Sequence, residues 1–530
     1  MKKITLLMVS ILMTFITHAQ WNSDTATNLL LADLTTGTIE SVTTSNGNTY
    51  TLIWSEVPSP ANYELRIQKT DALGNIQFGD QGALISDTLP MSSFTQVSSL
   101  TTDANENIYV GVTATNGNGG YAFKLDSNGN HLWDSNGISL GVGYIVRLLP
   151  LASGETIITW LSGSFNGTIQ KFDTSGNSLW TNPVELGSGT VPANSYELSN
   201  GSITIVYHVL LSGITSRLYA QNIDTNGNTQ WATPPQLFAN GNNTAYNVKY
   251  SGLQDGDVIY MSYKLAHDNR FDAYVQRINA DGTLPWGITG VDFDTNQTDY
   301  EQEIQIAMSP GSQNLFALCR YTGSGQGDSG IFLQKFDKET GARQLTDNAK
   351  EIYAISNNVS PIGDFRLSQD QPVFLTVEGN ELNINLLDSN GDFVWTEQSK
   401  PIATYAAGKS HVNLNKISNA ELVATFTEDR GSGEQAYAQN FTDNALSVSD
   451  FDTENSLQFI NPIHEILTLK SERELKSVYV YNALGQLVSK SQNIHSNKAT
   501  IDAQNWSRGL YLVTIKTVQN QMQNLKIIKK

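Results

Sequence analysis

The 530-residue sequence contains a single cysteine, few charged residues and no long apolar run beyond its first 19 residues. With Cys319 alone the chain cannot form an internal disulfide, and the strand-like surroundings of this residue favour a buried small side chain over a reactive thiol. The lack of a second long apolar run argues against a transmembrane helix. The sequence also lacks a nucleotide-binding loop, a zinc motif and a nucleophile elbow, so sites of these three classes are not predicted.

Positive charge is scarce over most of the chain. Lys and Arg number 32 against 51 Asp and Glu, which gives a net charge of -19. Residues 456–530 are the exception, with ten Lys and Arg against four acids, so that acids exceed Lys and Arg by 27 between residues 20 and 455. This asymmetry predicts a separate C-terminal domain. The acidity of the larger part argues against nucleic acid as a ligand, and against anionic glycans unless calcium bridges them.

The first 19 residues have the pattern of a secretory signal peptide. Lys2 and Lys3 precede an apolar stretch from Ile4 to Ile16, and small residues follow it up to Ala19. This stretch is too short for a stable membrane anchor, so we expect cleavage before Gln20.

The segment FKLDSNGNHLW at residues 123–133 returns down most of the sequence. Eight copies are recognisable, and their Asp-equivalent positions lie 47 to 58 residues apart. These positions are Asp71, Asp126, Asp173, Asp224, Asn279, Asp337, Asp388 and Thr442. A period of this size, with about four short strands in each unit, is typical of propeller blades. The sequence therefore predicts an all-β fold with an eight-bladed β-propeller over residues 20–454, and seven blades are the alternative.

Each copy predicts two strands joined by a tight turn. An Asn-Gly pair or a single Gly provides the positive φ angle that such a turn requires. An aromatic residue follows the Asp position after seven residues in most copies, and a Gln opens most of them. Because these residues recur from unit to unit, we interpret them as packing residues. The copies also resemble the D-x-x-G-x-x-x-W repeats of bacterial β-propeller proteins, most fully at Thr427 to Phe441, and this resemblance implies a fold but no particular function.

The eighth copy lacks its aromatic residue, since Ser449 occupies that position. The segment WNSDTATNLLLA, which begins at Trp21, resembles the stretch after Trp231 but has no turn motif before it. We therefore expect the N-terminal segment to supply the outer strand of the last blade. Such closure removes exposed sheet edges, which otherwise promote aggregation.

Residues 455–530 predict a small β-sandwich, with strands in ILTLKS, SVYVYNALGQLVSK, ATIDAQNW, GLYLVTIKT and LKIIKK. FINPIHEILTLKS, VYVYNALGQLV, W-x-x-G-L-Y-L-V-T-I and a basic end together resemble the type A C-terminal sorting domain of the type IX secretion system of Bacteroidetes. The matching positions are Asn461, Pro462, Gly485, Gly509 and Tyr511. Ile460 stands where the family usually has the first proline of a Pro-Asn-Pro opening.

This resemblance implies a partner in the type IX secretion machinery. It also implies a final location in the medium or on the outer-membrane surface, after removal of the signal peptide. An adhesive β-sandwich module is the alternative for this domain.

The repeated D-S-N-G-N and D-T-N-G-N segments contain oxygen ligands of the kind that calcium binds. An EF-hand loop needs Gly at its sixth position and a distant Glu, whereas Gly is fourth here and no such Glu follows. The sialidase Asp-box places its aromatic five residues after Asp, whereas the separation here is seven. A hairpin turn is the preferred interpretation, so no cofactor is expected, and a structural calcium ion is the alternative.

A functional site is expected where the copies differ. Unusual polar residues gather at 267–270, 320–329 and 428–430, in segments predicted as loops between second and third strands, and His208 ends a strand. A polysaccharide lyase needs a base such as His or Tyr near an Arg. The candidate catalytic residues are therefore His267, Arg270 and His208, and the candidate binding residues are Arg320, Tyr321, Asp429 and Arg430. The favoured alternative is that Arg270 and Arg430 form structural ion pairs with Asp268 and Asp429.

The sequence predicts an exported β-propeller that acts as a binding module for a glycan or a protein. The alternative function is a carbohydrate-active enzyme, either a polysaccharide lyase or a glycosidase, with its site on one face of the propeller. A cluster of His, Tyr and Arg at one mouth of the ring would favour the enzyme, and a flat acidic mouth would favour the binding module.

Overall fold

The computed structural model describes residues 21–442 and 458–530, except residues 23, 59–60, 92–97, 116–118, 213–214, 239–243, 246–249, 268–269, 419–420, 460, 483–485 and 519–521. The chain divides into two compact units, Met1–Thr442 and Asp443–Lys530. The predicted signal peptide and the predicted boundary after Glu454 lie outside the described residues. Within the described residues there is no α-helix, only a 3₁₀ turn, η2 (Ile355–Asn357), and no helix there is long and apolar enough to cross a membrane. The all-β prediction is confirmed.

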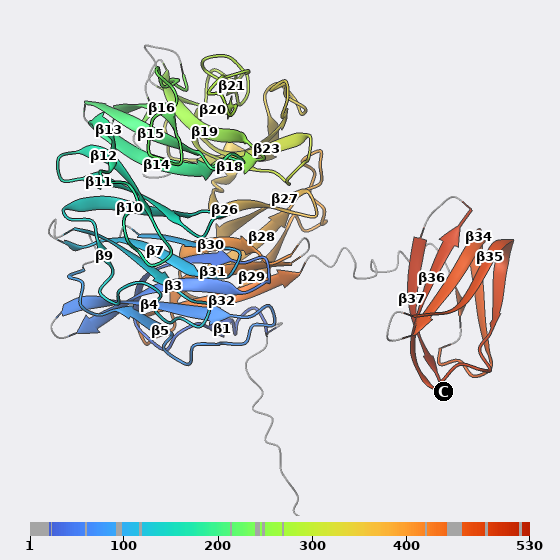
Figure 1. The fold of residues 1–530 in the computed structure, drawn as a ribbon. Coiled ribbons are helices and arrows are strands. Elements are labelled where there is room, and N and C mark those ends of the chain that lie inside the picture. Colours follow the sequence, from blue (N-terminus) through green and yellow to red (C-terminus); the bar gives the residue numbers. More distant parts are fainter. Residues whose placement is uncertain are drawn as a thin grey trace, which may run out of the picture. The chain divides into compact units, whose positions relative to one another are not determined.

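The first unit consists of eight antiparallel four-stranded sheets, drawn from blue to orange in Figure 1. Seven sheets each take four strands that follow one another in the chain. Their strands are β2 (Thr36–Thr43), β3 (Thr49–Pro58), β4 (Ala61–Thr70), β5 (Ala83–Ser86); β6 (Ser98–Thr102), β7 (Ile108–Thr113), β8 (Gly120–Leu125), β9 (Ile138–Ser139); β10 (Gly143–Pro150), β11 (Thr156–Ser162), β12 (Asn166–Phe172), β13 (Val184–Ser188); β14 (Thr190–Glu197), β15 (Ile203–Ser212), β16 (Thr215–Ile223), β17 (Thr244–Ala245); β18 (Gly252–Asp255), β19 (Val258–His267), β20 (Arg270–Ile278), β21 (Val291–Asp292); β22 (Tyr300–Ala307), β23 (Asn314–Thr322), β24 (Ser329–Asp337), β25 (Lys350–Tyr353); and β26 (Pro361–Ser368), β27 (Gln371–Glu378), β28 (Glu381–Leu386), β29 (Ser399–Ala403).

The eighth sheet joins the two ends of this unit. It contains β30 (Ser410–Lys416), β31 (Glu421–Asp429) and β32 (Glu434–Thr442), and its fourth strand is β1 (Leu29–Leu30). Leu29 pairs with Ala438 and Leu30 with Tyr437, so β1 in blue lies beside β32 in orange (Figure 1). The prediction that the N-terminal segment supplies the outer strand of the last sheet is confirmed.

Consecutive sheets pack on one another through buried aliphatic and aromatic side chains. Trp54 from the first sheet and Phe123 from the second belong to one such core, and later sheets share equivalent cores. The eighth sheet also contacts the first, because Ser41 Oγ lies 2.7 Å from Thr425 Oγ1 and accepts a hydrogen bond from Asn415 Nδ2. Middle strands such as β7 and β11 are therefore apolar on both faces, as expected for sheets covered on both sides.

The repeated Asp residues shape the turns of the hairpins. Asp126 Oδ1 accepts the N–H groups of Asn128 at 2.9 Å and Asn130 at 2.8 Å, and Asp126 Oδ2 accepts Asn130 Nδ2 at 3.0 Å. Gly129 has a φ of 82°, which L side chains rarely adopt. Asp71, Asp173, Asp224 and Asp388 make the same backbone bonds. These contacts match the hairpin interpretation, while structural calcium stays a prediction.

The repeated aromatic residues join neighbouring sheets. The Trp133 ring lies against Gly176 in the turn of the next sheet, where a Cβ atom would come within 3.1 Å of it. Trp133 Nε1 also donates to Thr174 O at 3.1 Å. Trp180 packs in the same way on Gly227. A side chain at this turn position would make a tight contact with the ring and force it to shift, so packing adds to the φ angle as a reason for Gly.

The repeated Gln residues hold the start of the outer strand. Gln170 Nε2 donates to Trp180 O at 3.0 Å, and Gln170 Oε1 accepts Trp180 N–H at 3.3 Å. In the eighth copy, Gln439 Nε2 donates to Asn22 O at 2.8 Å, while Trp21 packs on Gly74 of the first sheet's turn. The N-terminal segment thus takes over the contacts of a missing outer strand, and the packing interpretation of both residue types is confirmed.

The second unit contains β33 (Gln458–Phe459), β34 (Ile466–Asn482), β35 (Leu487–Asp502), β36 (Gly509–Thr517) and β37 (Met522–Lys529). The order is β33-β34-β36-β37, with β35 also paired to β34. The strand bounds differ from the prediction, because β34 joins ILTLKS to SVYVYN through an irregular register between Lys470 and Leu475, and β35 joins LVSK to ATID. Both halves of β34 bury side chains in a single core, and all five strands belong to one sheet, so the predicted sandwich stays a prediction.

Candidate functional site

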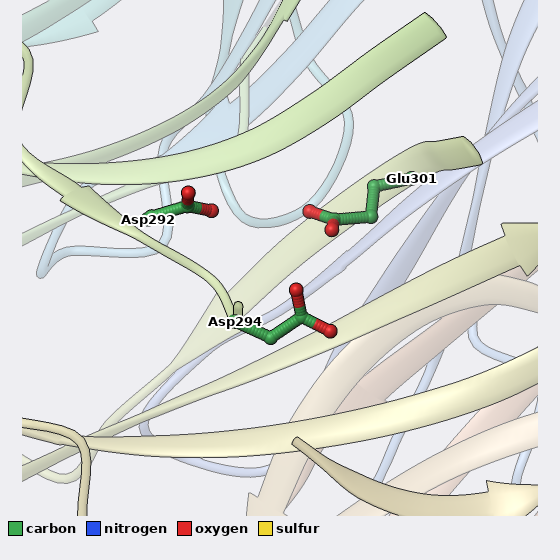
Figure 2. A group of neighbouring side chains, drawn as sticks. All are labelled: Asp292, Asp294 and Glu301. Atoms are coloured by element: carbon green, nitrogen blue, oxygen red, sulfur yellow. The ribbon is translucent and has the colours of Figure 1, made fainter. Parts of the chain in front are cut away.

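Three carboxyl groups of the first unit converge in its interior. Asp292 ends β21, Asp294 follows it, and Glu301 lies near the start of β22. Their carboxyl groups point toward a shared space (Figure 2), and one oxygen from each lies within 4.8 Å of the others. Asp294 and Glu301 are buried, while Asp292 is half-buried.

Hydrogen bonds from the surrounding strands fix this carboxyl cluster. Glu301 accepts the backbone N–H of Ala273 at 2.6 Å. Asp294 accepts the hydroxyl of Tyr321 at 2.5 Å and the backbone N–H of Asn296 at 2.7 Å. The cluster therefore ties β20, β22 and β23 to the segment after β21.

Burial favours the protonated form of these carboxyls. Burial and the charges of Asp272 and Asp294 raise the pKa of Asp292 to about 6. Burial and the charge of Asp294 hold the pKa of Glu301 well above its ordinary value, and burial also raises the pKa of Asp294. Three carboxylates at this spacing could hold a cation, but shared protons account equally for the arrangement.

The structure places Arg270 beside this cluster. Its guanidinium pairs with Asp272 at 2.7 Å and donates to Asn296 O at 3.1 Å and Gln297 Oε1 at 2.7 Å. The side chain is buried, and its ion-pair partner is Asp272 rather than the predicted Asp268, which lies outside the described residues. His267 pairs with Arg270 across the β19–β20 hairpin in the backbone register. The His267 side chain also lies outside the described part, so the predicted pair stays untested.

His208 lies within β15 in another sheet, whereas the sequence predicts it at the end of a strand. Its ring is fully buried, with Nδ1 3.2 Å from Ser216 Oγ and 3.3 Å from the Tyr250 hydroxyl. The structure therefore engages both His208 and Arg270 in internal hydrogen bonds, on different sheets.

The predicted binding residues Arg320 and Tyr321 lie within β23, whereas the sequence predicts a loop there. Alternation along β23 turns them to opposite faces. Tyr321 is buried, bonds to Asp294 and stacks on Phe332 with ring centroids 4.0 Å apart. Arg320 is partly exposed and lies 3.5 Å from Glu303.

Asp429 and Arg430 lie at the β31–β32 hairpin and serve different contacts. Asp429 Oδ1 accepts the N–H of Gly431 at 2.7 Å and so shapes the hairpin. Arg430 Nε donates to Glu428 Oε1 at 2.7 Å, and Arg430 Nη2 donates to Asn28 Oδ1 at 3.0 Å. Lys409 Nζ lies 2.7 Å from the other oxygen of Glu428, and both side chains are fully buried. Arg430 therefore pairs with Glu428 rather than with the predicted Asp429, and it attaches the N-terminal segment to the eighth sheet.

The described sorting-motif residues organise the end of the second unit. Asn461 Oδ1 accepts the N–H of Ile528 at 2.8 Å, and Asn461 Nδ2 donates to Lys526 O at 3.3 Å. Pro462 follows directly, before Ile463, whose N–H donates to Ile528 O at 2.8 Å. Tyr511 donates its hydroxyl to Ser507 O at 2.8 Å, shortly before β36 begins at Gly509. Gly485 lies outside the described residues.

The sequence analysis did not single out an exposed apolar patch in the first unit. The name covers Val142, Phe165 and Leu211, three exposed side chains on segments that backbone hydrogen bonds join, and the Phe165 side chain is 60 % exposed. The N–H of Gly163 donates to Val142 O at 2.8 Å. Gly189 links the Phe165 hairpin to the strand that carries Leu211. Its N–H donates to Phe165 O, and its carbonyl oxygen accepts the N–H of Leu210, each at 2.8 Å. A large aromatic within the turn segment SGSFNG is the sequence signal that could have identified it.

Comparison with known proteins identifies one segment of the chain. Residues 459–530 match the family model described as "Secretion system C-terminal sorting domain". No curated protein matches the chain.

Several solved structures resemble the chain at low identity. An ulvan lyase bound to -[GlcA(1-4)Rha3S]- is 14 % identical and has a TM-score of 0.42, and the alignment covers 80 % of this chain and 96 % of the lyase chain. An α-L-arabinofuranosidase of Fusarium graminearum with arabinobiose is 11 % identical, with coverages of 57 % and 93 % and a TM-score of 0.31. A puromycin hydrolase is 12 % identical, with coverages of 78 % and 61 % and a TM-score of 0.37. At such scores these similarities carry no argument about function.

The family match supports one conclusion, that residues 459–530 form a type IX C-terminal sorting domain. Such a domain implies interaction with the type IX secretion machinery and export to the cell surface or the extracellular space.

Proposed function

We propose that the first unit is a closed eight-bladed β-propeller and acts, after export, as a binding module for a neutral glycan or a protein. Eight four-stranded sheets, the contacts of the eighth sheet with the first and the insertion of β1 into the eighth sheet support the blade count and the closure.

The observation that carries the binding function is the apolar patch of Val142, Phe165 and Leu211. These side chains are exposed on hairpins and a connection of two successive sheets. Exposed apolar side chains on adjoining segments often mark a contact surface. Phe165 also has a positive φ of 58°, which is uncommon for a bulky residue.

The state of the candidate catalytic residues supports binding over catalysis. The described groups, Arg270 and His208, are buried and engaged in internal hydrogen bonds. A general base or a group that neutralises a substrate charge must contact the substrate. Burial and internal hydrogen bonds keep Arg270 and His208 from doing so.

The excess of 27 acids between residues 20 and 455 favours neutral glycans or proteins as ligands, because like charges repel polyanions at long range. Asp292 gives the enzyme alternative one specific support, since it is half-buried and its pKa of about 6 suits a general base.

The test is electrophoresis of the mature chain through native gels that contain neutral or acidic polysaccharides, together with glycan and protein arrays. We expect retardation by a neutral polysaccharide, or capture by a protein ligand, without loss of polymer. Phe165→Ser should abolish the retardation or capture. Leu73→Ser is the matched control, because Leu73 is equally exposed on a repeat turn outside the patch.

Cleavage of a polymer would contradict the binding proposal and favour the enzyme. Asp292→Asn, Arg270→Ala and His208→Ala would then locate the activity. Binding that Phe165→Ser leaves unchanged would contradict the role of the patch.

A further inference from the structure

We propose that the outward face of the sheet formed by β35, β34, β36 and β37 in the sorting domain is a docking surface, and that its partner is a protein of the secretion machinery with an apolar contact surface edged by carboxylates. This inference rests on the sorting-domain match and is independent of what the first unit binds.

The strand register places the apolar side chains of this surface on one face. Tyr481 of β34 pairs with Leu487 of β35 and with Leu512 of β36. Leu510, two residues before Leu512, pairs with Ile528 of β37. Directly paired residues and residues two apart project to the same side of a sheet, so these five side chains form one continuous surface across four strands.

The opposite face of the same strands is the core. Val480, Val513, Leu525 and Ile527, which alternate with the outward residues, are buried. A sheet with one solvated face normally carries polar side chains there. Leu487, Leu510, Leu512 and Ile528 instead remain 40 % to 50 % exposed, which is the pattern of an uncovered contact surface.

Lysine side chains lie around the margin of this surface. Lys526 pairs with Leu512, and Lys490 pairs with Tyr479, which lies two residues before Tyr481 on the same face. Lys530, two residues after Ile528, lies at the end of the chain. The named residues of this face include no acid, whereas the domain carries six more Lys and Arg than acids. Charge complementarity therefore calls for a partner with carboxylates around its apolar contact.

The geometry favours recognition through this face over addition of a strand to the edge. β37 is the last strand in the sheet order, but the segment Asn461–Ile463 covers its outer side. Asn461 bonds to Ile528 N–H and Lys526 O, Ile463 N–H donates to Ile528 O, and Lys530 N–H donates to Ile463 O at 3.0 Å. These backbone groups are already paired, so an incoming strand would have to displace the segment. The Asn-Pro motif thus acts as a positioning element that holds Ile528 and Lys526 on the docking face.

The first experiment measures export of the full chain in a bacterium with a functional type IX secretion system. The double substitution Leu510→Ser and Leu512→Ser should reduce the exported fraction roughly tenfold, as expected when central apolar contacts of an interface are removed. The matched control is Leu73→Ser with Ile288→Ser, two exposed apolar side chains of the first unit, which should leave export unchanged. The purified variants should keep the wild-type unfolding curve, because the replaced side chains lie outside the core.

The second experiment places a photo-crosslinking residue at position 512 of the full chain, with the exposed position 73 of the first unit as the comparison site. We expect a crosslink from position 512 to a protein of the secretion machinery, absent from cells that lack the machinery and weakened by Lys526→Glu. Unchanged export of the folded Leu510→Ser, Leu512→Ser variant would overturn the proposal. Crosslinking only to lipid, or only to the first unit of the same chain, would also overturn it. Neither result depends on a ligand of the first unit.

Discussion

The larger unit and the sorting domain cover their antiparallel sheets in different ways. In the larger unit neighbouring sheets pack on one another, and β7 is buried at every position. In the sorting domain one face packs on the core while the other exposes Leu510 and Ile528. A repeated sheet that is buried on both sides depends on its neighbours for stability, whereas a single domain can leave one face for a partner. The two parts also differ in net charge, since the larger unit is acidic and the sorting domain is basic.

The largest expected effect comes from removing a contact between neighbouring sheets. Trp180→Ala should lower the free energy of unfolding of the first unit by about 4 kcal/mol, since it deletes a nearly buried ring that packs on Gly227. Chemical denaturation followed by circular dichroism measures this change. Leu179→Ala, one residue earlier and exposed, is the control and should have little effect. An equal loss in both variants would contradict the dependence of each sheet on its neighbour.

The ion pair that holds the N-terminal segment gives the next effect. Arg430→Ala should lower the free energy of unfolding of the first unit by about 3 kcal/mol, because Glu428 then keeps only Lys409 as a buried partner. Arg366→Ala removes the exposed pair with Asp364 and should cost under about 1 kcal/mol. Limited proteolysis should cut the N-terminal segment faster in Arg430→Ala alone. The sorting domain should keep its own unfolding transition in both variants.

The carboxyl cluster predicts a pH dependence confined to the first unit. The pKa of Asp292 is raised to about 6 in the folded state, so its contribution to stability is fully present below the unfolded pKa and is lost as the pH rises through 6. Asp292→Asn should therefore stabilise the first unit at pH 8 by roughly 1–2 kcal/mol, a value that allows for partial solvent screening, and should have little effect at pH 4. Thermal unfolding between pH 4 and pH 8 measures the difference. A stabilisation that is the same at both pH values would contradict this assignment.

A single repeat turn gives the smallest effect. Asp126→Ala removes the acceptor of two backbone N–H groups and should cost about 1 kcal/mol. Hydrogen bonds hold the pKa of Asp126 below its ordinary value, so the difference from wild type should shrink in acid as the carboxyl is protonated. Ser127→Ala in the same turn is the control for denaturant unfolding. A loss as large as that of Trp180→Ala would show that turns, rather than contacts between sheets, hold the repeat.

Local patterns in the sequence predicted much of the fold. Asn128-Gly129 predicts a turn because the φ of Gly129 depends on residues within the turn. Trp133 and Gln170 are identified as structural because they recur, and a contact that each unit makes needs a residue in each unit. Trp21 could be assigned to the last sheet for the same reason, since the eighth copy lacks this aromatic residue.

The candidate sites were harder to predict because they depend on partners far away in the chain. Arg270 is a plausible catalytic residue in the sequence, but Asn296 and Gln297 from a later loop surround it in the fold. Glu301 and Asp294 shift their pKa values because strand packing buries them together. Phe165 stands in a polar turn, and only the fold shows that its side chain stays exposed and that backbone hydrogen bonds join its hairpin to the segment of Leu210 and Leu211.

The sequence by itself determined the repeat, its turns, the N-terminal strand of the eighth sheet and the sorting domain, because each depends on residues close together in the chain or on a pattern that recurs. Only the tertiary structure decided which polar side chains form internal hydrogen bonds and ion pairs, and which apolar side chains are exposed. Burial and ion pairing are properties of neighbours in space, and sheets that contact one another bring together residues as distant as Asn28 and Arg430.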